Sequence, residues 1–452
     1  MSRLPSNWAE TQLGSLIERV EAGLNVKCEE RPPQGKERGL VKISAVTWGR
    51  FNEEQSKTLP ADIAVSANAQ IQTGDLLFSR ANTIELVGAT VLVEKIEKCL
   101  YLSDKVLRLV VPAESKRWIN YAMKTAVVRK AIQDASSGNQ LSMRNISQEK
   151  LRQIPIPLAP LPEQKRIADK LNSVLARVDA CRDRLDRLPA LLKRFRLSIL
   201  AAATSGRLTE DWRLATGHTG TGPYPTTKLS TVAISRLGKM LDKAKNSGSL
   251  TPYLRNVNVR WFDFDLSDIQ EMRIEDSERE ALFIKTGDLL ICEGGEPGRC
   301  AIWHGENGQF IFQKALHRVR PDHNRLLSQW LAFSLKFAAD NNTLEDLFTG
   351  TTIKHLTGVA LANFEIPLPP LPEQTEIVRR VELLFAFADR LEARLATARR
   401  QVGQLTPALL AKAFRGELVP QDPADEPAAE LLKRLAAQCG AAPKAKRGRS
   451  SV

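Results

Sequence analysis

The chain has 452 residues, of which 43% are hydrophobic and 26% are charged, and its formal net charge is +13 at neutral pH. This length exceeds what one hydrophobic core usually organises, so we expect two or more domains, and the excess of Lys and Arg favours a polyanionic partner. The sequence holds no long apolar run, no leader peptide and no C-x-x-C pair among its six cysteines. These absences argue against a membrane span and favour a cytoplasmic protein with free thiols.

The first 157 residues predict a domain of mixed α and β structure. A Gly-Asp turn at 74–75 leads into an apolar run at 76–78, which is typical of a turn that feeds a strand. The segment 118–133 has the apolar spacing of an amphipathic helix. Three further apolar runs are typical of strands: 41–43, 87–93 and 106–111.

A different kind of segment begins with Pro-Leu-Ala-Pro-Leu-Pro-Glu-Gln at 157–164. Closely spaced prolines disfavour a helix, so we expect an extended lead-in that fixes where the next helix begins. From Ile167 to Ile199, apolar residues recur at alternating intervals of four and three, with Leu188 among them, which predicts a long coiled-coil helix. At about 1.5 Å per residue this helix measures roughly 50 Å, with a kink expected at Pro189.

The whole helical segment returns 210 residues later. Residues 367–374 read Pro-Leu-Pro-Pro-Leu-Pro-Glu-Gln, and the register holds without a gap from Ser-Gly-Arg-Leu at 205–208 to Arg-Gly-Glu-Leu at 415–418. One apolar stripe alone is compatible with a helix lying on its own domain, but two stripes in the same register favour pairing between the helices. A second kink is expected at Pro407. The positions assigned to helix pairing are Ile167, Leu171, Val178, Leu185, Leu192, Ile377, Val381, Leu391, Leu395 and Val402.

The segments that precede the two helices repeat more faintly. Lys-Thr-Gly-Asp-Leu-Leu-Ile at 285–291 resembles Gln-Thr-Gly-Asp-Leu-Leu-Phe at 72–78, and Gly-Thr-Thr-Ile at 350–353 resembles Gly-Asn-Gln-Leu at 138–141. Elsewhere the segments differ, and 326–339 predicts a further amphipathic helix. This pattern indicates one scaffold with two different recognition surfaces. The predicted boundaries are 1–157 and 214–367 for the variable domains, 158–213 and 368–436 for the helical spacers, and 437–452 for a basic disordered tail.

Motifs of catalysis and of cofactor binding are missing from the sequence. There is no Asn-Pro-Pro-aromatic motif of amino-methyltransferases, no G-x-x-x-x-G-K-[ST] loop and no G-x-G-x-x-G loop. Cys292, Cys300 and His304 match no standard zinc spacing, so buried thiols are the favoured interpretation. We therefore expect no catalytic residue, no metal and no cofactor.

Several of these features occur together in one known family. They are the doubled Pro-Leu-x-Pro-Leu-Pro-Glu-Gln entry with its heptad helix and Gly-containing exit, Leu-Pro-Ser-Asn-Trp at 4–8, the two Thr-Gly-Asp-Leu-Leu segments and the stretch 416–432. In these features the chain resembles the specificity subunits of type I restriction-modification systems. The resemblance implies an α+β fold in which two target-recognition domains are separated by two long antiparallel coiled-coil helices, with an internal pseudo-two-fold repeat.

The resemblance also implies the partners. Two methyltransferase (modification) subunits would bind the conserved helical regions, at the pairing positions named above, and restriction/translocase subunits would join the larger assembly. Those partners would supply S-adenosylmethionine-dependent adenine methylation and ATP-dependent cleavage. This chain would bind double-stranded DNA and perform no catalysis.

Two similar domains held apart by a helical spacer predict recognition of two half-sites about one helical turn, roughly 10 base pairs, apart, with the bases between them unread. Base contacts need donors and acceptors on loops at the groove edge, where Arg or Lys suits guanine, Asn or Gln suits adenine and Glu suits cytosine. In the first domain the candidates are Arg80, Asn82, Thr83, Lys105, Asn139, Gln140 and Arg144. In the second domain they are Glu293, Arg299, Trp303, Lys314, Thr351, Thr352 and Lys354.

Two other functions stay open at this point. A nuclease or methyltransferase with degenerate motifs is opposed by the missing cofactor loops. A coiled-coil adaptor whose variable domains bind proteins is opposed by the net charge of +13.

Overall fold

The structure is a computed structural model that describes residues 4–140, 143–217, 224–242, 244, 246–350 and 354–441. The fold is α+β, as the sequence predicts. Contacts divide the chain into two compact units: the first combines Met1–Arg184 with Ala398–Val452, and the second is the continuous segment Leu185–Thr397. Each unit contains one mixed α and β domain and part of both long helices.

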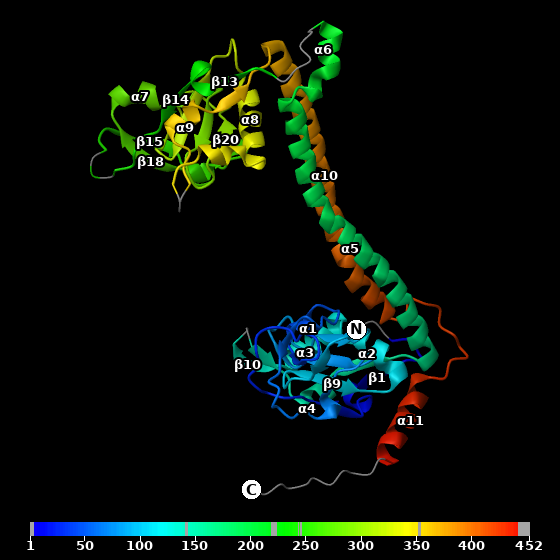
Figure 1. Cartoon of the computed structure of the whole chain (residues 1–452). Helices are drawn as coiled ribbons and strands as arrows, with labels where there is room; N and C mark the ends of the chain where they lie inside the picture. The colour runs from blue at the N-terminus through cyan, green and yellow to red at the C-terminus, as the bar shows by residue number, and fades with distance from the viewer. Residues whose placement is uncertain are drawn as a thin grey trace. The chain divides into compact units, whose positions relative to one another are not determined.

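The first unit is built around small, mainly antiparallel sheets (Figure 1). Its strands are β1 (Ala9–Gln12), β2 (Arg19–Glu21), β3 (Arg38–Val41), β4 (Ser56–Thr58), β5 (Leu76–Ser79), β6 (Ala81–Asn82), β7 (Thr90–Leu92), β8 (Cys99–Tyr101), β9 (Val106–Val110), β10 (Ser137–Gln140), β11 (Met143–Asn145) and β12 (Pro155–Leu158). Its short helices are α1 (Ser44–Thr47), α2 (Lys116–Ala122), α3 (Ala126–Ala135) and α4 (Gln148–Arg152). The strand orders are β2-β9-β5-β7, β4-β3-β8 and β10-β11-β6, and β1 pairs with β12.

The second unit repeats this topology. Its strands are β13 (Thr226–Lys228), β14 (Ala233–Leu237), β15 (Ser249–Leu254), β16 (Val259–Arg260), β17 (Asp263–Phe264), β18 (Gln270–Ile274), β19 (Leu289–Cys292), β20 (Cys300–Ile302), β21 (Ile311–Phe312), β22 (Leu316–Pro321) and β23 (Glu365–Pro367). Its short helices are α6 (Glu210–Thr216), α7 (Asp276–Leu282), α8 (Ser328–Asp340) and α9 (Gly358–Ala362). The orders β14-β22-β19-β20 and β18-β15-β21 match the first two sheets of the first unit strand for strand, and β13 pairs with β23 as β1 pairs with β12. The internal repeat predicted from the sequence is therefore a repeat of the fold.

The repeated Gly-Asp turn has the same structural role in both units. The glycine of each turn has a φ of +89°, a left-handed conformation that glycine adopts without strain. The aspartate then accepts a hydrogen bond from the backbone N–H three residues earlier and pairs with an arginine on the neighbouring strand. Asp75 lies 2.7 Å from Arg108, and Asp288 lies 2.6 Å from Arg320. The motif therefore fixes the start of β5 and β19, from which the adjacent recognition loops emerge.

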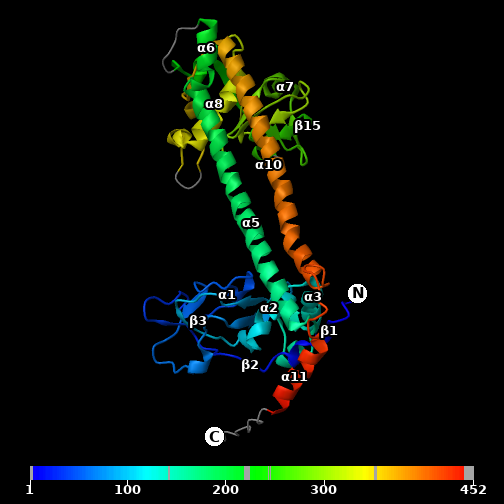
Figure 2. The ribbon, with the colours of Figure 1, turned by 90° about the vertical axis from the view of Figure 1, so that its right-hand side faces the viewer.

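The two long helices are α5 (Leu161–Thr204) and α10 (Leu371–Ala413), which begin 210 residues apart and continue through their internal prolines. Strands β12 and β23 precede them, which confirms the extended lead-in. Within the second unit the helices lie side by side and antiparallel (Figure 2). Arg196 of α5 contacts Asp389 of α10 at 2.6 Å, whereas Arg380, earlier in α10, contacts Asp211 in α6, just beyond the end of α5, also at 2.6 Å.

The apolar stripe of each helix contacts both the adjacent domain and the other helix. All of the positions that the sequence assigned to helix pairing are buried or half-buried. Ile167 and Leu171 lie in the core of the first unit together with Leu410 of α10, and Ile377 lies in the core of the second unit together with Ile199 of α5. The two readings of the stripe, packing on a domain and pairing between helices, are therefore both correct.

Two local predictions are wrong. The helix predicted over 118–133 is divided into α2 and α3, because the hydroxyl of Thr125 accepts a hydrogen bond from the N–H of Val128 and begins a new helix. Leu188 continues the heptad spacing but is 38% exposed, so apolar spacing overestimates how far the seam is covered.

The last helix, α11 (Ala428–Ala441), belongs to the first unit. Leu431 packs in the core of that unit, and Asp425 pairs with Arg166 of α5 at 2.6 Å. Because α11 includes residues 437–441, the beginning of the segment expected to be disordered is helical. The remainder of that segment lies outside the described residues.

The Pro-Glu-Gln of each helix entry is a buried polar anchor. Gln164 and Gln374 each donate a side-chain N–H to the carbonyl five residues earlier, at 2.8 Å, and so close the proline-rich turn. In the first unit the neighbouring Glu163 is buried and accepts a hydrogen bond from the indole of Trp8 at 2.9 Å. Burial raises the pKa of Glu163 above its ordinary value. The Leu-Pro-Ser-Asn-Trp segment therefore anchors the start of α5.

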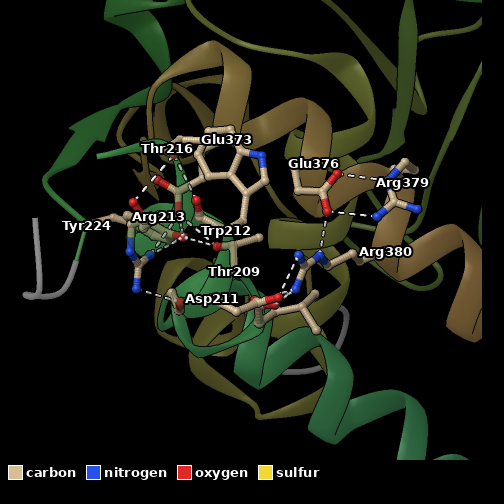
Figure 3. Close-up of polar contacts among 12 residues, drawn as sticks. Thr209, Asp211, Trp212, Arg213, Thr216, Tyr224, Glu373, Glu376, Arg379 and Arg380 are labelled. Carbon is tan, nitrogen blue, oxygen red and sulfur yellow. Dashed lines mark hydrogen bonds and ion pairs between the residues drawn. The ribbon is translucent and has the colours of Figure 1, made fainter. Parts of the chain in front are cut away.

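The equivalent glutamate of the second unit, Glu373, has more donors. One of its carboxylate oxygens accepts from Thr209 and Arg213 at 2.7 Å and from Tyr224 at 2.6 Å (Figure 3). Burial and the hydrogen bond to Glu373 raise the pKa of Tyr224 to about 12. Both helix entries use a buried glutamate, but only the second neutralises its charge with a buried arginine.

We expect Glu163→Gln to stabilise the first unit at pH 7, because the neutral amide removes the cost of burying a carboxylate that has no cationic partner. A raised pKa means that wild-type stability is fully present below the ordinary pKa of a glutamate and falls as the pH rises toward the folded pKa. The difference in melting temperature between variant and wild type should therefore be positive at pH 7 and vanish near pH 4. A variant that melts lower at pH 7 would show that the Trp8 contact needs the charge.

Candidate DNA interface

The candidate residues of the first domain, which are widely separated in sequence, meet at one edge of the fold. The N–H of Arg80 donates to the carbonyl of Lys105 at 3.0 Å, and the carbonyl of Arg80 accepts from the N–H of Ile146 at 3.0 Å. Asn82 lies opposite Arg144 in the β6–β11 pairing. The backbone of the loop after β5 is therefore fixed on both sides, while its side chains remain available.

The side chains of these candidates differ in how free they are. Within the described part of the chain, neither the Arg80 guanidinium nor the Lys105 ammonium has a hydrogen bond or an ion pair. The amide of Asn82 donates to the hydroxyl of Thr47 at 3.3 Å, and Thr83 is half-buried. Arg144 donates to the carbonyls of Ser136 and Gly138, so it holds the β10–β11 hairpin together. Asn139 and Gln140 lie in β10, and their side chains are outside the described set.

A hollow of about 500 Å³ opens beside these residues. Its lining includes Trp48, Asn82 and Lys105 together with Lys42 and Lys57. Lys42 and Lys57 also contact the exposed carboxylate of Glu30. Lysine side chains dominate the charged lining, which suits a polyanion.

The candidates of the second domain are arranged by the same backbone contacts. The N–H of Glu293 donates to the carbonyl of Ala315 at 2.9 Å, and its carbonyl accepts from the N–H of Leu356 at 2.8 Å. These two bonds match those of Arg80 with Lys105 and Ile146. Glu293 therefore occupies the position of Arg80, 213 residues later in the sequence.

Two candidates of the second domain are tied to the protein itself. Trp303 is 3% exposed and packs edge-on against Phe264 and Phe310, so its assignment as a DNA contact is wrong and it is a core residue. Arg299 is largely buried, because its guanidinium pairs with Glu296 at 2.9 Å and donates to the carbonyl of Asn256 at 2.9 Å. Arg299 therefore supports the turn that presents Glu293 and is poorly placed to contact a base.

The other candidates of the second domain remain near the surface. Lys314 is exposed, and its N–H donates to the carbonyl of Lys239. Lys354 pairs with Glu345 at 2.5 Å, and both side chains are half-exposed. Thr351 and Thr352 lie outside the described residues.

The cysteines that were weighed as metal ligands are structural. Cys292 and Cys300 are fully buried, and burial raises the pKa of each thiol, that of Cys292 to about 11. Among the residues that the structure describes, no three His, Cys, Asp or Glu side chains gather as metal ligands would. Over the same residues, no helix has the length and apolarity that crossing a membrane requires.

Sequence reasoning missed the most exposed aromatic residue of the first domain. Trp48 follows α1 and is 75% exposed, yet it lines the hollow beside Asn82 and Lys105. The signal was present in the repeat, because Trp48 and Trp261 are 213 residues apart, the same interval that separates Arg80 from Glu293. Read together, these intervals align the two domains beyond their Gly-Asp turns.

Comparisons with known proteins agree with this architecture. The family described as type I restriction modification DNA specificity domain matches residues 5–190 and 230–398. The chain is 32% identical over 335 residues to the type I restriction enzyme EcoKI specificity subunit of Escherichia coli K12, with 71% of each chain covered. It is 32% identical over 349 residues to the StySPI specificity subunit of Salmonella potsdam, with 72% of each covered.

Two solved structures share the fold. One, from a study of complex assembly and conformational transition of the type I R-M system, matches with a TM-score of 0.64 at 19% identity, covering 92% of this chain and 100% of that one. The other is the HsdS subunit from Thermoanaerobacter tengcongensis, with a TM-score of 0.53 at 20% identity, covering 92% and 98%. On the family match and the two close relatives, the chain belongs to the specificity subunits of type I restriction-modification systems, the components that recognise DNA and do not catalyse.

Proposed function

We propose that the two variable domains of this chain each read one half of a bipartite DNA target. The observation that supports this proposal most strongly is the equivalent placement of Arg80 and Glu293, which have the same backbone hydrogen bonds and opposite charges. A guanidinium suits the acceptors of guanine in the major groove, and a carboxylate suits the amino group of cytosine. The two domains would thus have different base preferences on one scaffold.

The helices would act as the spacer between the two half-sites. Half-sites read from one face of DNA lie about one helical turn, roughly 10 base pairs, apart, and the bases between them would go unread. Because both domains belong to one chain, binding of the second half-site is intramolecular, so two weak contacts give one tight complex.

Two modification subunits would dock on the long helices, and restriction subunits would join through them, in the cytoplasm. The positions first assigned to docking are buried or half-buried within the chain, so their role is to pair and pack the helices. Exposed apolar side chains elsewhere on α5 and α10 are better placed to contact a partner, since large apolar groups left in water favour association. They are Leu191, Leu383, Phe387 and Leu405, which are between 44% and 58% exposed.

A binding experiment tests the recognition of two half-sites. The target would first be defined by mapping methylated adenines, and the chain with its modification subunits would then be titrated with target and random duplexes at several salt concentrations. We expect Arg80→Ala and Glu293→Ala each to weaken target binding by about 1–3 kcal/mol, because each removes a base contact, and to leave random binding nearly unchanged. The control is Lys130→Ala, an exposed cation on α3 outside the candidate loops.

The outcomes separate the proposed function from its alternatives. Equal losses on target and random DNA would make Arg80 a phosphate contact. A wild-type complex that binds both duplexes equally would contradict sequence recognition by this chain, and methylation by the isolated chain would favour an enzyme.

A further inference from the structure

The equivalent tryptophans Trp48 and Trp261 have different surroundings. Each precedes a residue in the left-handed conformation, Gly49 with a φ of +81° and Phe262 with a φ of +66°, so the same turn is present in both domains. The ring of Trp261 is covered by the ammonium of Lys336, 4.7 Å from the ring centroid, and its indole N–H donates to Glu296 at 2.7 Å. The scaffold therefore allows this tryptophan to pack against the protein.

In the first domain the same position is turned out to solvent. Trp48 is 75% exposed and, among the described residues, no aromatic ring stacks on it and no cation lies over it. A large apolar side chain gains most from being covered, so an indole left in water on a rigid turn favours an external contact. The fold does not require this exposure, because the second domain covers its equivalent.

The chemistry around Trp48 favours DNA as that external contact. Trp48 follows Thr47, whose hydroxyl accepts the hydrogen bond from Asn82, and Arg80 is two residues before Asn82. The hollow that Trp48 lines also holds Lys105, whose carbonyl fixes the backbone of Arg80. A flat apolar ring beside unpaired cations suits base edges and sugars between phosphates.

We propose that Trp48 is a DNA-contacting residue of the first domain, and that its indole packs against the bases of the half-site beside Arg80. The proposal rests on the proposed function, since it assigns a further residue to the same interface. The indole carries no charge, so its contribution is an apolar contact that releases no counterion. Its loss should therefore weaken binding without changing how binding depends on salt.

The test uses the chain assembled with its modification subunits and a duplex that carries the target. Trp48→Ala should weaken target binding about 10-fold, with an unchanged slope of log affinity against log salt, and Trp48→Phe should retain most of the affinity. Val127→Ala is the control, because Val127 is also exposed in this domain, at 65%, but lies outside the hollow. In the unaltered complex, iodinated pyrimidines placed along the half-site should photocrosslink to the peptide that contains Trp48.

Each other result overturns the inference in a recognisable way. Unchanged affinity of Trp48→Ala, together with no crosslink, would remove Trp48 from the interface while leaving the recognition of DNA intact. A variant that no longer assembles with the modification subunits would make Trp48 a protein contact. A wild-type complex that does not distinguish target from random DNA would instead contradict the proposed function itself.

Discussion

Replacing Glu373 by Ala should destabilise the second unit by about 3–5 kcal/mol, because it leaves the buried guanidinium of Arg213 without a counter-charge. Glu373 is 2% exposed, and its carboxylate lies 2.7 Å from Arg213. The hydroxyls of Thr209 and Tyr224 would lose their shared acceptor as well. Hydrogen exchange is the appropriate measurement, since it separates peptides of the second unit from those of the first.

Two further variants make the Glu373 result specific. Asp389→Ala removes a carboxylate that is 69% exposed and whose partner Arg196 keeps Glu392, so exchange should hardly change. The double replacement Glu373→Ala with Arg213→Met should recover much of the loss, because no buried charge then remains unpaired. Unaltered exchange across 205–216 and 371–397 in the single variant would contradict the anchoring role of this carboxylate.

Leu171→Asp should unfold much of the first unit, with a loss of at least about 4 kcal/mol, because it buries an unpaired carboxylate and removes core volume. Leu171 is fully buried in the core that also contains Leu410 and Phe414. Leu188→Asp is the matched comparison, since Leu188 continues the same heptad spacing but is 38% exposed. Thermal unfolding should show a loss for Leu188→Asp of only about 0.5–1 kcal/mol. Similar losses for the two variants would mean that the heptad spacing alone, and not burial, sets the cost.

The long helices and the repeat could be predicted from the sequence because they are written at short range. An apolar residue every third or fourth position follows from helix geometry, and Ile167 and Ile377 both meet that expectation. The Gly-Asp turn was recognisable for the same reason, since a glycine with positive φ and the aspartate that follows it form a local pattern. How far the seam stays covered, as at Leu188, depends on neighbours that the spacing does not contain.

The recognition residues were harder to predict because their surroundings come from distant segments. Arg80 and Lys105 were expected on surface loops and are unpaired within the described residues. Trp303 and Arg299 were chosen by the same reasoning but are covered by Phe264, Phe310 and Glu296, which no local pattern links to them. A loop position in sequence therefore does not distinguish a free side chain from a structural one.

The discontinuous first unit has a consequence for how the protein is made. Its core contains Ile167 and Leu171 together with Leu410, Phe414 and Leu431, and all of the second unit lies between these groups in the chain. During synthesis the second unit can fold as soon as its own residues have left the ribosome, because it is continuous. The first domain must wait, with part of its apolar surface uncovered, until the strands and helices of the second have been translated. In the nascent chain, the domain that is encoded first is therefore the one that matures last.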